Sequence, residues 1–174
     1  MELYALSIAG PFGYWLLSQQ TIEPYGQKTV ELRSWKPPRL GIMVAIHCSQ
    51  NKEFDHNFKR LGIDPALVPK SSILGVAVLN EYRVYDTEEQ WERDRHSYCW
   101  VGDEAYNYIR SEYYGGPPIG HVFSEFMLFP EPILNVPGDR QYWRPNPKKP
   151  KLLERQEAGF KATKATIAAM RSET

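Results

Sequence analysis

The chain lacks the usual marks of a metalloprotein or a disulfide-rich protein. It has only two cysteines, Cys48 and Cys99, which lie far apart with no second cysteine near either, so neither a zinc finger nor a disulfide framework is predicted. His56, His96 and His121 do not have the short spacing that binds zinc. We therefore expect no metal site and no cofactor.

The first residues also lack a basic leader and an apolar run long enough for a signal peptide or a membrane span. Two cysteines that are not placed to pair fit a reducing compartment. The sequence therefore predicts a cytoplasmic protein that has no membrane partner.

The chain has no net charge, because its 21 lysines and arginines are balanced by 21 aspartates and glutamates. It has no overall field that would attract a polyanion, and any basic surface has to be local. One local excess lies in residues 144–171, which hold eight basic and two acidic residues and thus a net charge of +6. Such a tail either faces a polyanion or keeps a terminal helix solvated.

The size and composition predict one packed domain, because 174 residues with 42% hydrophobic content suffice for a core. Residues 1–147 are expected to form this domain, and residues 148–174 a basic C-terminal helix or tail. The apolar residues of the tail recur at helical spacing, so the helix is predicted to be amphipathic. Such a helix can dock on the domain with one side and meet a polyanion with the other.

Short apolar runs between turn residues predict strands, and helical periodicity with capping residues predicts helices. Strands are expected at residues 3–8, 41–47, 73–79, 121–129 and 140–143, and helices at 13–20, 51–61 and 88–95. This order predicts an α+β fold: a small β-barrel of about five to six strands, flanked by helices and ending in the amphipathic basic helix.

The most informative segment begins at Gly26, where charged residues and a tryptophan surround a chain reversal. If Gly26 allows the turn and the following residues are extended, Glu31 and Arg33 lie on one face of the strand, and Val30 and Leu32 lie on the other. The apolar pair should then point into the core. Glu31 and Arg33 form either an ion pair that closes the turn or part of a ligand site.

Gly26, Lys28, Glu31 and Arg33 match the G-x-K-x-x-E-x-R motif of ASCH (activating signal cointegrator homology) domains, which are relatives of the PUA fold. The likeness covers about residues 5–144, and it looks especially like the domain at the end of the eukaryotic activating signal cointegrator proteins. The resemblance implies a PUA-like β-barrel with a positively charged cleft beside the motif. Such clefts are proposed to take RNA, DNA or a modified nucleoside.

Under this resemblance the protein binds nucleic acid, with Lys28 and Arg33 as the cations of the cleft. Lysine supplies a mobile charge and arginine a planar fork suited to phosphate, while Trp35 either stacks on a base or belongs to the core. The basic tail adds phosphate contacts. The predicted nucleic-acid-binding residues are Lys28, Glu31, Arg33, Trp35, Arg144, Lys148, Lys149 and Lys151.

A hydrolase that uses the same cleft is the alternative. Some small ASCH relatives are amidohydrolases of acylated cytidine and others are ribonucleases, and Lys28 and Glu31 would then be the catalytic pair. In the deacylating group a threonine occupies the position of Glu31, so this chain departs from that catalytic pattern. We therefore expect binding rather than catalysis.

Two further features have competing explanations. Residues Tyr98–Tyr114 are rich in aromatic side chains, which either pack as an insert, as we expect, or contact a protein partner. His47 precedes Cys48, but consecutive strand residues point to opposite faces, so the two are not expected to act together as base and nucleophile. A satisfied histidine at the mouth of the barrel is predicted instead.

Overall fold

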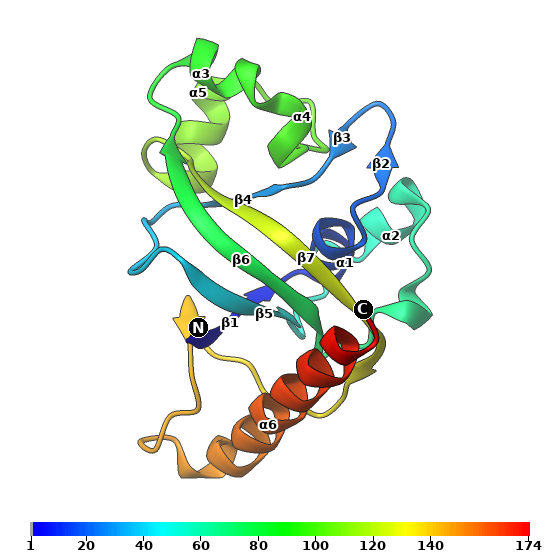
Figure 1. The fold of residues 1–174 in the computed structure, drawn as a ribbon. Coiled ribbons are helices and arrows are strands. Elements are labelled where there is room, and N and C mark those ends of the chain that lie inside the picture. Colours follow the sequence, from blue (N-terminus) through cyan, green and yellow to red (C-terminus); the bar gives the residue numbers. More distant parts are fainter. Residues whose placement is uncertain (1) are drawn as a thin grey trace.

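One curled six-stranded sheet forms the centre of the protein in its computed structural model, which describes residues 2–174 (Figure 1). Its strands are β1 (Leu3–Ile8), β4 (Val30–Arg33), β5 (Ile42–Cys48), β6 (Ser72–Val84), β7 (Ile119–Ile133) and β8 (Tyr142–Trp143). Their order is β4-β7-β6-β5-β1-β8, in which β1 and β5 are parallel and all other neighbours are antiparallel. A separate hairpin pairs β2 (Thr21–Ile22) with β3 (Gly26–Gln27).

The six strands and their flanking helices confirm the predicted α+β class and strand number. The barrel is only half closed, however, because within the described chain the edge strands β4 and β8 share no backbone ladder. Side chains bridge this open seam. The Arg33 guanidinium on β4 donates to the Ser7 carbonyl of β1 at 2.9 Å, and the His121 ring on β7 lies 2.8 Å from the Tyr142 hydroxyl on β8.

The helices are α1 (Gly10–Ser18), α2 (His56–Leu61), α3 (Glu88–Arg93), α4 (Arg95–Tyr98), α5 (Tyr106–Tyr108) and α6 (Pro150–Ser172), with a 3-10 turn η1 (Pro65–Leu67) and a π-helical turn η2 (Ile109–Tyr114). A capping box between Thr87 and Gln90 starts α3 where the sequence predicts it. Helix α1 starts earlier than predicted, because Pro11 occupies its first turn, where proline is tolerated. No helix in residues 2–174 is both long enough and apolar enough to span a membrane.

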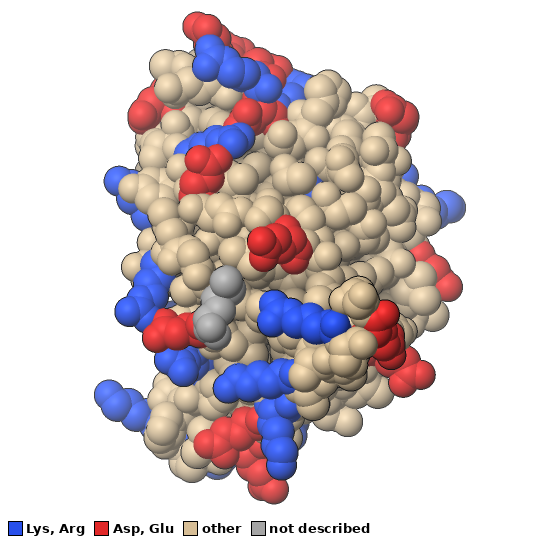
Figure 2. All heavy atoms as spheres, in the orientation of Figure 1, with Lys and Arg blue, Asp and Glu red and all other residues tan. Residues whose placement is uncertain are grey.

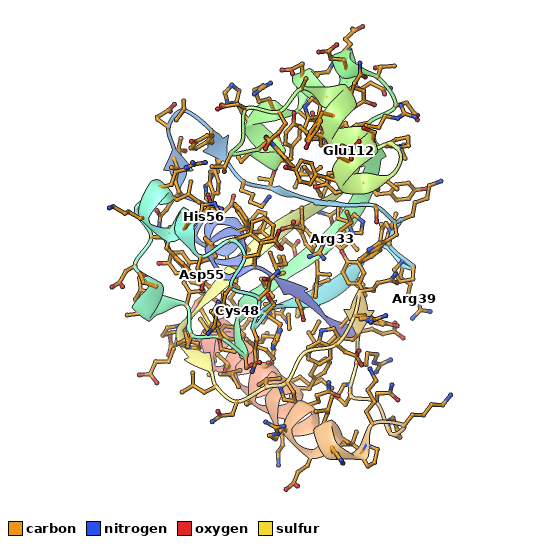
Figure 3. All side chains as sticks on the ribbon, turned by 180° about the vertical axis from the view of Figure 1, so that it is seen from behind. Arg33, Arg39, Cys48, Asp55, His56 and Glu112 are labelled. Atoms are coloured by element: carbon orange, nitrogen blue, oxygen red, sulfur yellow. The ribbon has the colours of Figure 1, made fainter. Side chains whose placement is uncertain are left out.

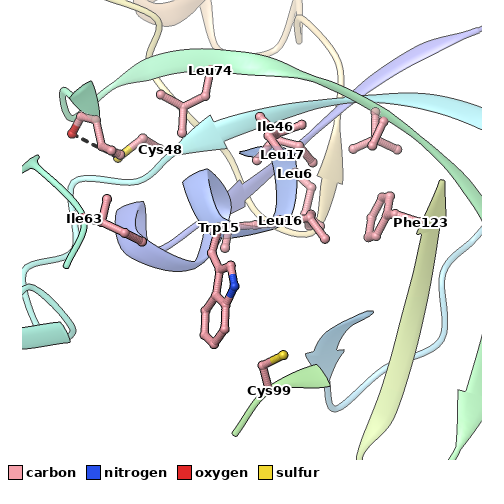
Figure 4. Packing of buried hydrophobic residues seen from close by; sticks show 14 of the residues in the cluster. Leu6, Trp15, Leu16, Leu17, Ile46, Cys48, Ile63, Leu74, Cys99 and Phe123 are labelled. Atoms are coloured by element: carbon pink, nitrogen blue, oxygen red, sulfur yellow. Dashed lines mark hydrogen bonds between the residues drawn. The ribbon is translucent and has the colours of Figure 1, made fainter. Parts of the chain in front are cut away.

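The two faces of the sheet are covered by different helices. Successive residues of β1 point to opposite faces, so Leu6 packs with α1 and α2, whereas Leu3 packs with α6. Figure 4 shows the α1 side, where Trp15 and Leu16 lie beside strand residues such as Ile46. All seven residues of β5 are buried, as expected for a central strand that is covered on both faces.

The basic helix α6 is docked on the sheet, with Phe160 and Ile167 buried in the cluster on that face. The predicted amphipathic helix is therefore present. The division between residues 1–147 and 148–174 stays a prediction, since docking does not test whether the first part folds alone.

The segment between β6 and β7 forms a third cluster over β4. Val30 and Leu32 pack there against Trp91 and Tyr98, as the strand alternation predicts. The aromatic insert Tyr98–Tyr114 is thus mainly packed, although the side chains of two of its tyrosines, Tyr108 and Tyr113, remain exposed. The insert holds β4, and with it the motif, against the rest of the domain.

Two histidines are fully buried, and both make two hydrogen bonds. His47 lies 2.9 Å from the Ser7 hydroxyl and 2.7 Å from the Val136 carbonyl, which confirms the prediction of a satisfied histidine. His121 lies 2.8 Å from the Trp35 carbonyl and 2.8 Å from Tyr142. A carbonyl only accepts, so one nitrogen of each ring donates to its carbonyl, whereas the hydroxyl at the other nitrogen can donate or accept. Burial lowers the pKa of both rings below the ordinary value.

We expect the protein to lose stability as the pH falls below about 6.5, the ordinary pKa of histidine. The unfolded chain binds protons at His47 and His121 in a pH range where the folded chain keeps both neutral. The free energy of unfolding should therefore fall by up to about 1.4 kcal/mol per pH unit for each histidine. Denaturant unfolding across this pH range measures the slope. His47→Gln should reduce it, because it removes one of the two buried rings.

Candidate functional site

The motif begins in the β2–β3 hairpin, and Gly26 is required there by its surroundings. Its φ is +121°, a conformation that residues with side chains rarely adopt. A Cβ atom at this position would lie 2.5 Å from the carbonyl oxygen of His96 in α4. The glycine therefore lets the hairpin approach the insert closely and sets the position of the residues that follow.

Lys28 is buried and fixed, so the expectation of a mobile cation is wrong. Its side chain is 4% exposed, and Nζ donates to the carbonyl oxygens of Val30 at 2.8 Å and of Tyr98 at 2.9 Å. Nζ lies 3.9 Å from Oε2 of Glu31, which supplies the nearest opposite charge. The ammonium group thus ties β4 to the insert and presents one remaining N–H.

Glu31 and Arg33 lie on the other face of β4 from Val30 and Leu32, as predicted. Within the described residues Glu31 and Arg33 do not form an ion pair with each other. The alternative that they only close the turn as an ion pair is therefore wrong. Arg33 instead donates a hydrogen bond from one guanidinium nitrogen to the Ser7 carbonyl. Its Nε and Oε2 of Glu31 are buried without a hydrogen-bond partner.

A cleft with a volume of about 720 Å³ opens beside these residues. Across residues 2–174, three buried side-chain atoms lack a hydrogen-bond partner: Oε2 of Glu31, Nε of Arg33 and Oδ1 of Asn57. All three belong to residues that line this cleft. Buried polar atoms are nearly always paired in folded proteins, so their concentration here marks a place that a ligand or ordered water completes. Arg33 and His56, both lining residues, are labelled in Figure 3.

Aromatic side chains form much of the cleft wall. The rings of Phe12 in α1 and Phe54 meet edge-on with their centres 5.6 Å apart, and the ring centres of Trp100 and Tyr113 in the insert are also 5.6 Å apart. Glu104 holds the second pair, since it accepts from the Trp100 indole at 2.8 Å and from the Tyr113 hydroxyl at 3.3 Å. The aromatic lining residues are Phe12, Phe54, Tyr98, Trp100, Tyr113 and Tyr114.

The cleft carries no net charge, which corrects the expected positive cleft. Its basic lining residues Lys28, Arg33 and Arg60 are matched by three acidic ones, Glu31, Glu53 and Glu104. Cys99 also lines it, but burial raises the pKa of this thiol to about 11, so it is not an activated nucleophile at neutral pH. In the described part of the chain no group of three His, Cys, Asp or Glu side chains could hold a metal ion.

The other predicted binding residues lie outside this lining. Trp35 makes T-shaped contacts with the rings of His121 and Tyr142, at 5.0 and 5.6 Å between ring centres, and the Arg33 guanidinium lies over its ring. Arg144 lies over the Tyr4 ring, and Lys149 pairs with Asp139 at 2.6 Å. Lys148 and Lys151 are exposed beside the start of α6. Of the eight predicted residues, the structure brings Lys28, Glu31 and Arg33 together in one cleft.

Sequence reasoning missed Asn57, Trp100 and Tyr114 as lining residues. The sequence predicts a helix at residues 51–61 and gives no sign that Asn57, near the start of the shorter α2, is buried and lines the cleft. The aromatic richness of the insert predicts packing or contact with a protein partner, and neither points to the cleft. The sequence has no pattern that connects either segment to the motif, because contact between them arises only in the folded chain.

Structural comparison finds matches to ASCH proteins from Zymomonas mobilis. The crystal structure of ASCH from this organism superposes with a TM-score of 0.54 at 16% sequence identity, over 87% of this chain and 93% of that chain. Two point variants give TM-scores of 0.51 and 0.52 at 17% identity, over 87% and 88% of this chain and 94% and 98% of theirs. The protein has the ASCH fold. No family model and no curated protein sequence matches the chain.

These matches confirm the fold that the motif from Gly26 to Arg33 predicts. Identities of 16% and 17% show the fold alone, so ligand and chemistry have to be argued from the cleft.

Proposed function

We propose that the cleft binds a nucleobase, carried either by an unpaired nucleotide of RNA or DNA or by a free nucleoside. The observation that carries this proposal is the presence of three unpartnered buried polar atoms within one aromatic-lined cleft. Nε of Arg33 is a donor, and Oε2 of Glu31 and Oδ1 of Asn57 are acceptors. The edges of nucleobases present donors and acceptors side by side, so a base can satisfy such a set.

The size and walls of the cleft support the same ligand class. A volume of about 720 Å³ lies within the range of about 300–1,000 Å³ that small-molecule sites occupy. Aromatic walls favour flat ligands, because stacking of a base on an aromatic side chain contributes about 1–3 kcal/mol.

The balanced charge of the lining argues against the backbone of a polynucleotide as the main ligand of the cleft. Three cations and three carboxylates give no field that gathers phosphates. Binding in the cleft should therefore depend mainly on the base and only weakly on salt. Nucleic acid remains the proposed partner, with the base inside the cleft.

Hydrolysis at the same cleft is the second candidate, and the position of Glu31 favours it. Its free Oε2 lies 3.9 Å from the Lys28 ammonium. In this function the Glu31 carboxylate takes a proton from a water molecule, whose oxygen attacks the carbonyl carbon of an N-acylated base. The Lys28 ammonium stabilises the negative oxygen that forms. The C–N bond to the base then breaks, and the proton held by Glu31 passes to the departing amine, which leaves the acyl group as a carboxylic acid.

Asn57→Leu tests the proposal. Removal of a buried amide without a hydrogen bond to its oxygen should leave the melting temperature unchanged or raise it, because a buried unsatisfied polar group is unfavourable. Binding of nucleosides and short single strands should weaken by about tenfold, which corresponds to one lost hydrogen bond. Calorimetric titration measures both ligand types.

Asn107→Leu is the matched control, because Asn107 is exposed on α5 and does not line the cleft. Equal affinities of wild type and the Asn57 variant would count against the base-binding cleft. Glu31→Gln separates the two functions: it should abolish turnover of acylated nucleosides if hydrolysis occurs, while binding changes only modestly.

A further inference from the structure

A second hollow, of about 640 Å³, lies on the opposite face of the sheet from the cleft, between the start of β1 and α6. Three basic side chains from two separate elements line it: Arg144, just after β8, and Lys161 and Lys164 on α6. Glu157 is the acidic lining residue, so the hollow has a net charge of +2. We call this hollow the α6 groove.

The three cations of the α6 groove have no ion-pair partner in residues 2–174. Seven basic side chains elsewhere in these residues do have a carboxylate partner, as in Arg83 with Asp94 at 2.8 Å. Of the eight basic residues between 144 and 171, only Lys149 has a carboxylate partner. Figure 2 shows lysine and arginine side chains gathered over the part of the molecule where Figure 1 draws α6.

The groove is also held in place by its surroundings. Phe160 lies next to Lys161 and is buried against the sheet, so the helix that carries both lysines is fixed. The Arg144 guanidinium lies 5.3 Å from the centre of the Tyr4 ring, and this contact orients it while its N–H groups stay available. Positioned cations lose less entropy on binding an anion than free lysines do.

We propose that the α6 groove is a phosphate-binding site, distinct from the cleft, that holds the backbone of a nucleic-acid strand. This inference rests on the proposed function for its choice of polyanion. It divides recognition between two places: the neutral cleft takes a base, and the basic groove on the other face takes phosphates. Affinity for a strand then exceeds affinity for a nucleoside, and the excess depends on salt.

A short single strand of abasic deoxyribose phosphate is the probe, because it offers phosphates without bases. Lys161→Gln/Lys164→Gln should reduce the salt slope of its binding by about 1.4, from about 0.7 per phosphate contact, and weaken binding about twentyfold in about 0.1 M salt. The matched control is Arg155→Gln/Arg171→Gln, which removes the same charge from the same helix outside the groove. The control should retain most of the affinity.

Each outcome decides the inference. Equal losses in the two double variants would show a general charge effect and would overturn the groove, as would failure of the wild type to bind the abasic strand. Binding of anionic vesicles in preference to the strand would overturn it as well. Nucleoside binding is measured in parallel and should be unchanged in the Lys161/Lys164 variant. If the wild type bound no nucleoside, the base-binding cleft would be contradicted. The α6 groove would still be tested by binding of the abasic strand.

Discussion

Lys28→Ala is expected to lower the free energy of unfolding by about 3 kcal/mol, because the ammonium group is buried and donates to two backbone carbonyls. The substitution leaves the carbonyl oxygens of Val30 and Tyr98 without their donor and leaves the Glu31 carboxylate without its nearest positive charge. The contact between β4 and the insert depends on these bonds. Denaturant unfolding monitored by tryptophan fluorescence measures the loss.

Two further lysine variants identify the cause. Lys28→Met keeps the length of the side chain and should be nearly as unstable as Lys28→Ala, because it also leaves the two carbonyls unpaired. Lys52→Ala removes an exposed lysine and should change stability by less than about 0.5 kcal/mol. A loss below about 1 kcal/mol in both Lys28 variants would contradict the structural role of the buried ammonium. Loss of binding in Lys28→Ala alone is therefore no proof of a ligand contact.

The motif could be predicted from sequence because its chemistry is local. Alternation along four residues of β4 is enough to place Val30 and Leu32 in the core and Glu31 and Arg33 opposite them. The same alternation does not predict which segments face Glu31 and Arg33. Asn57 and the insert reach it through contacts between distant segments, which no periodicity encodes.

The charge of the cleft could not be predicted for the same reason. The motif by itself has one more cation than carboxylates, which favours a positive site. Two more carboxylates, Glu53 and Glu104, come from the loop before α2 and from the insert, and with Arg60 of α2 they bring the net charge of the lining to zero. In α6 the excess of basic residues lies along a single helix, so the sequence is enough to predict that this element is basic.

Strand positions were predicted well where burial is continuous and poorly where it is not. The limits of β1 agree with the prediction, since both of its ends are buried apolar residues, Leu3 and Ile8. Strands β6 and β7 extend past the predicted ends by several residues, and the added parts carry exposed polar side chains such as Glu81 and Glu131. Backbone pairing between the two strands, which the hydrophobic pattern does not report, keeps most of these residues in the sheet.

The glycine of the motif provides the second large effect. Gly26→Ala should destabilise the fold by about 3 kcal/mol, because it combines an unfavourable φ with a steric clash. The new Cβ would lie 2.5 Å from the His96 carbonyl oxygen, a backbone atom that cannot move aside without shifting α4. Since Tyr98 at the end of α4 accepts from Lys28, the same shift should loosen the ammonium and weaken ligand binding.

Two other glycines separate the contributions of φ and steric clash. Gly62→Ala places a side chain at a φ of +67° with no atom within 4 Å, so it should show the cost of the backbone conformation alone, about 1 kcal/mol. Gly116→Ala meets neither a positive φ nor a neighbour and should be neutral or slightly stabilising. Thermal unfolding of the three variants tests the order Gly26, Gly62, Gly116. If Gly26→Ala were no worse than Gly62→Ala, the close approach of hairpin and insert would not be what requires glycine in the motif.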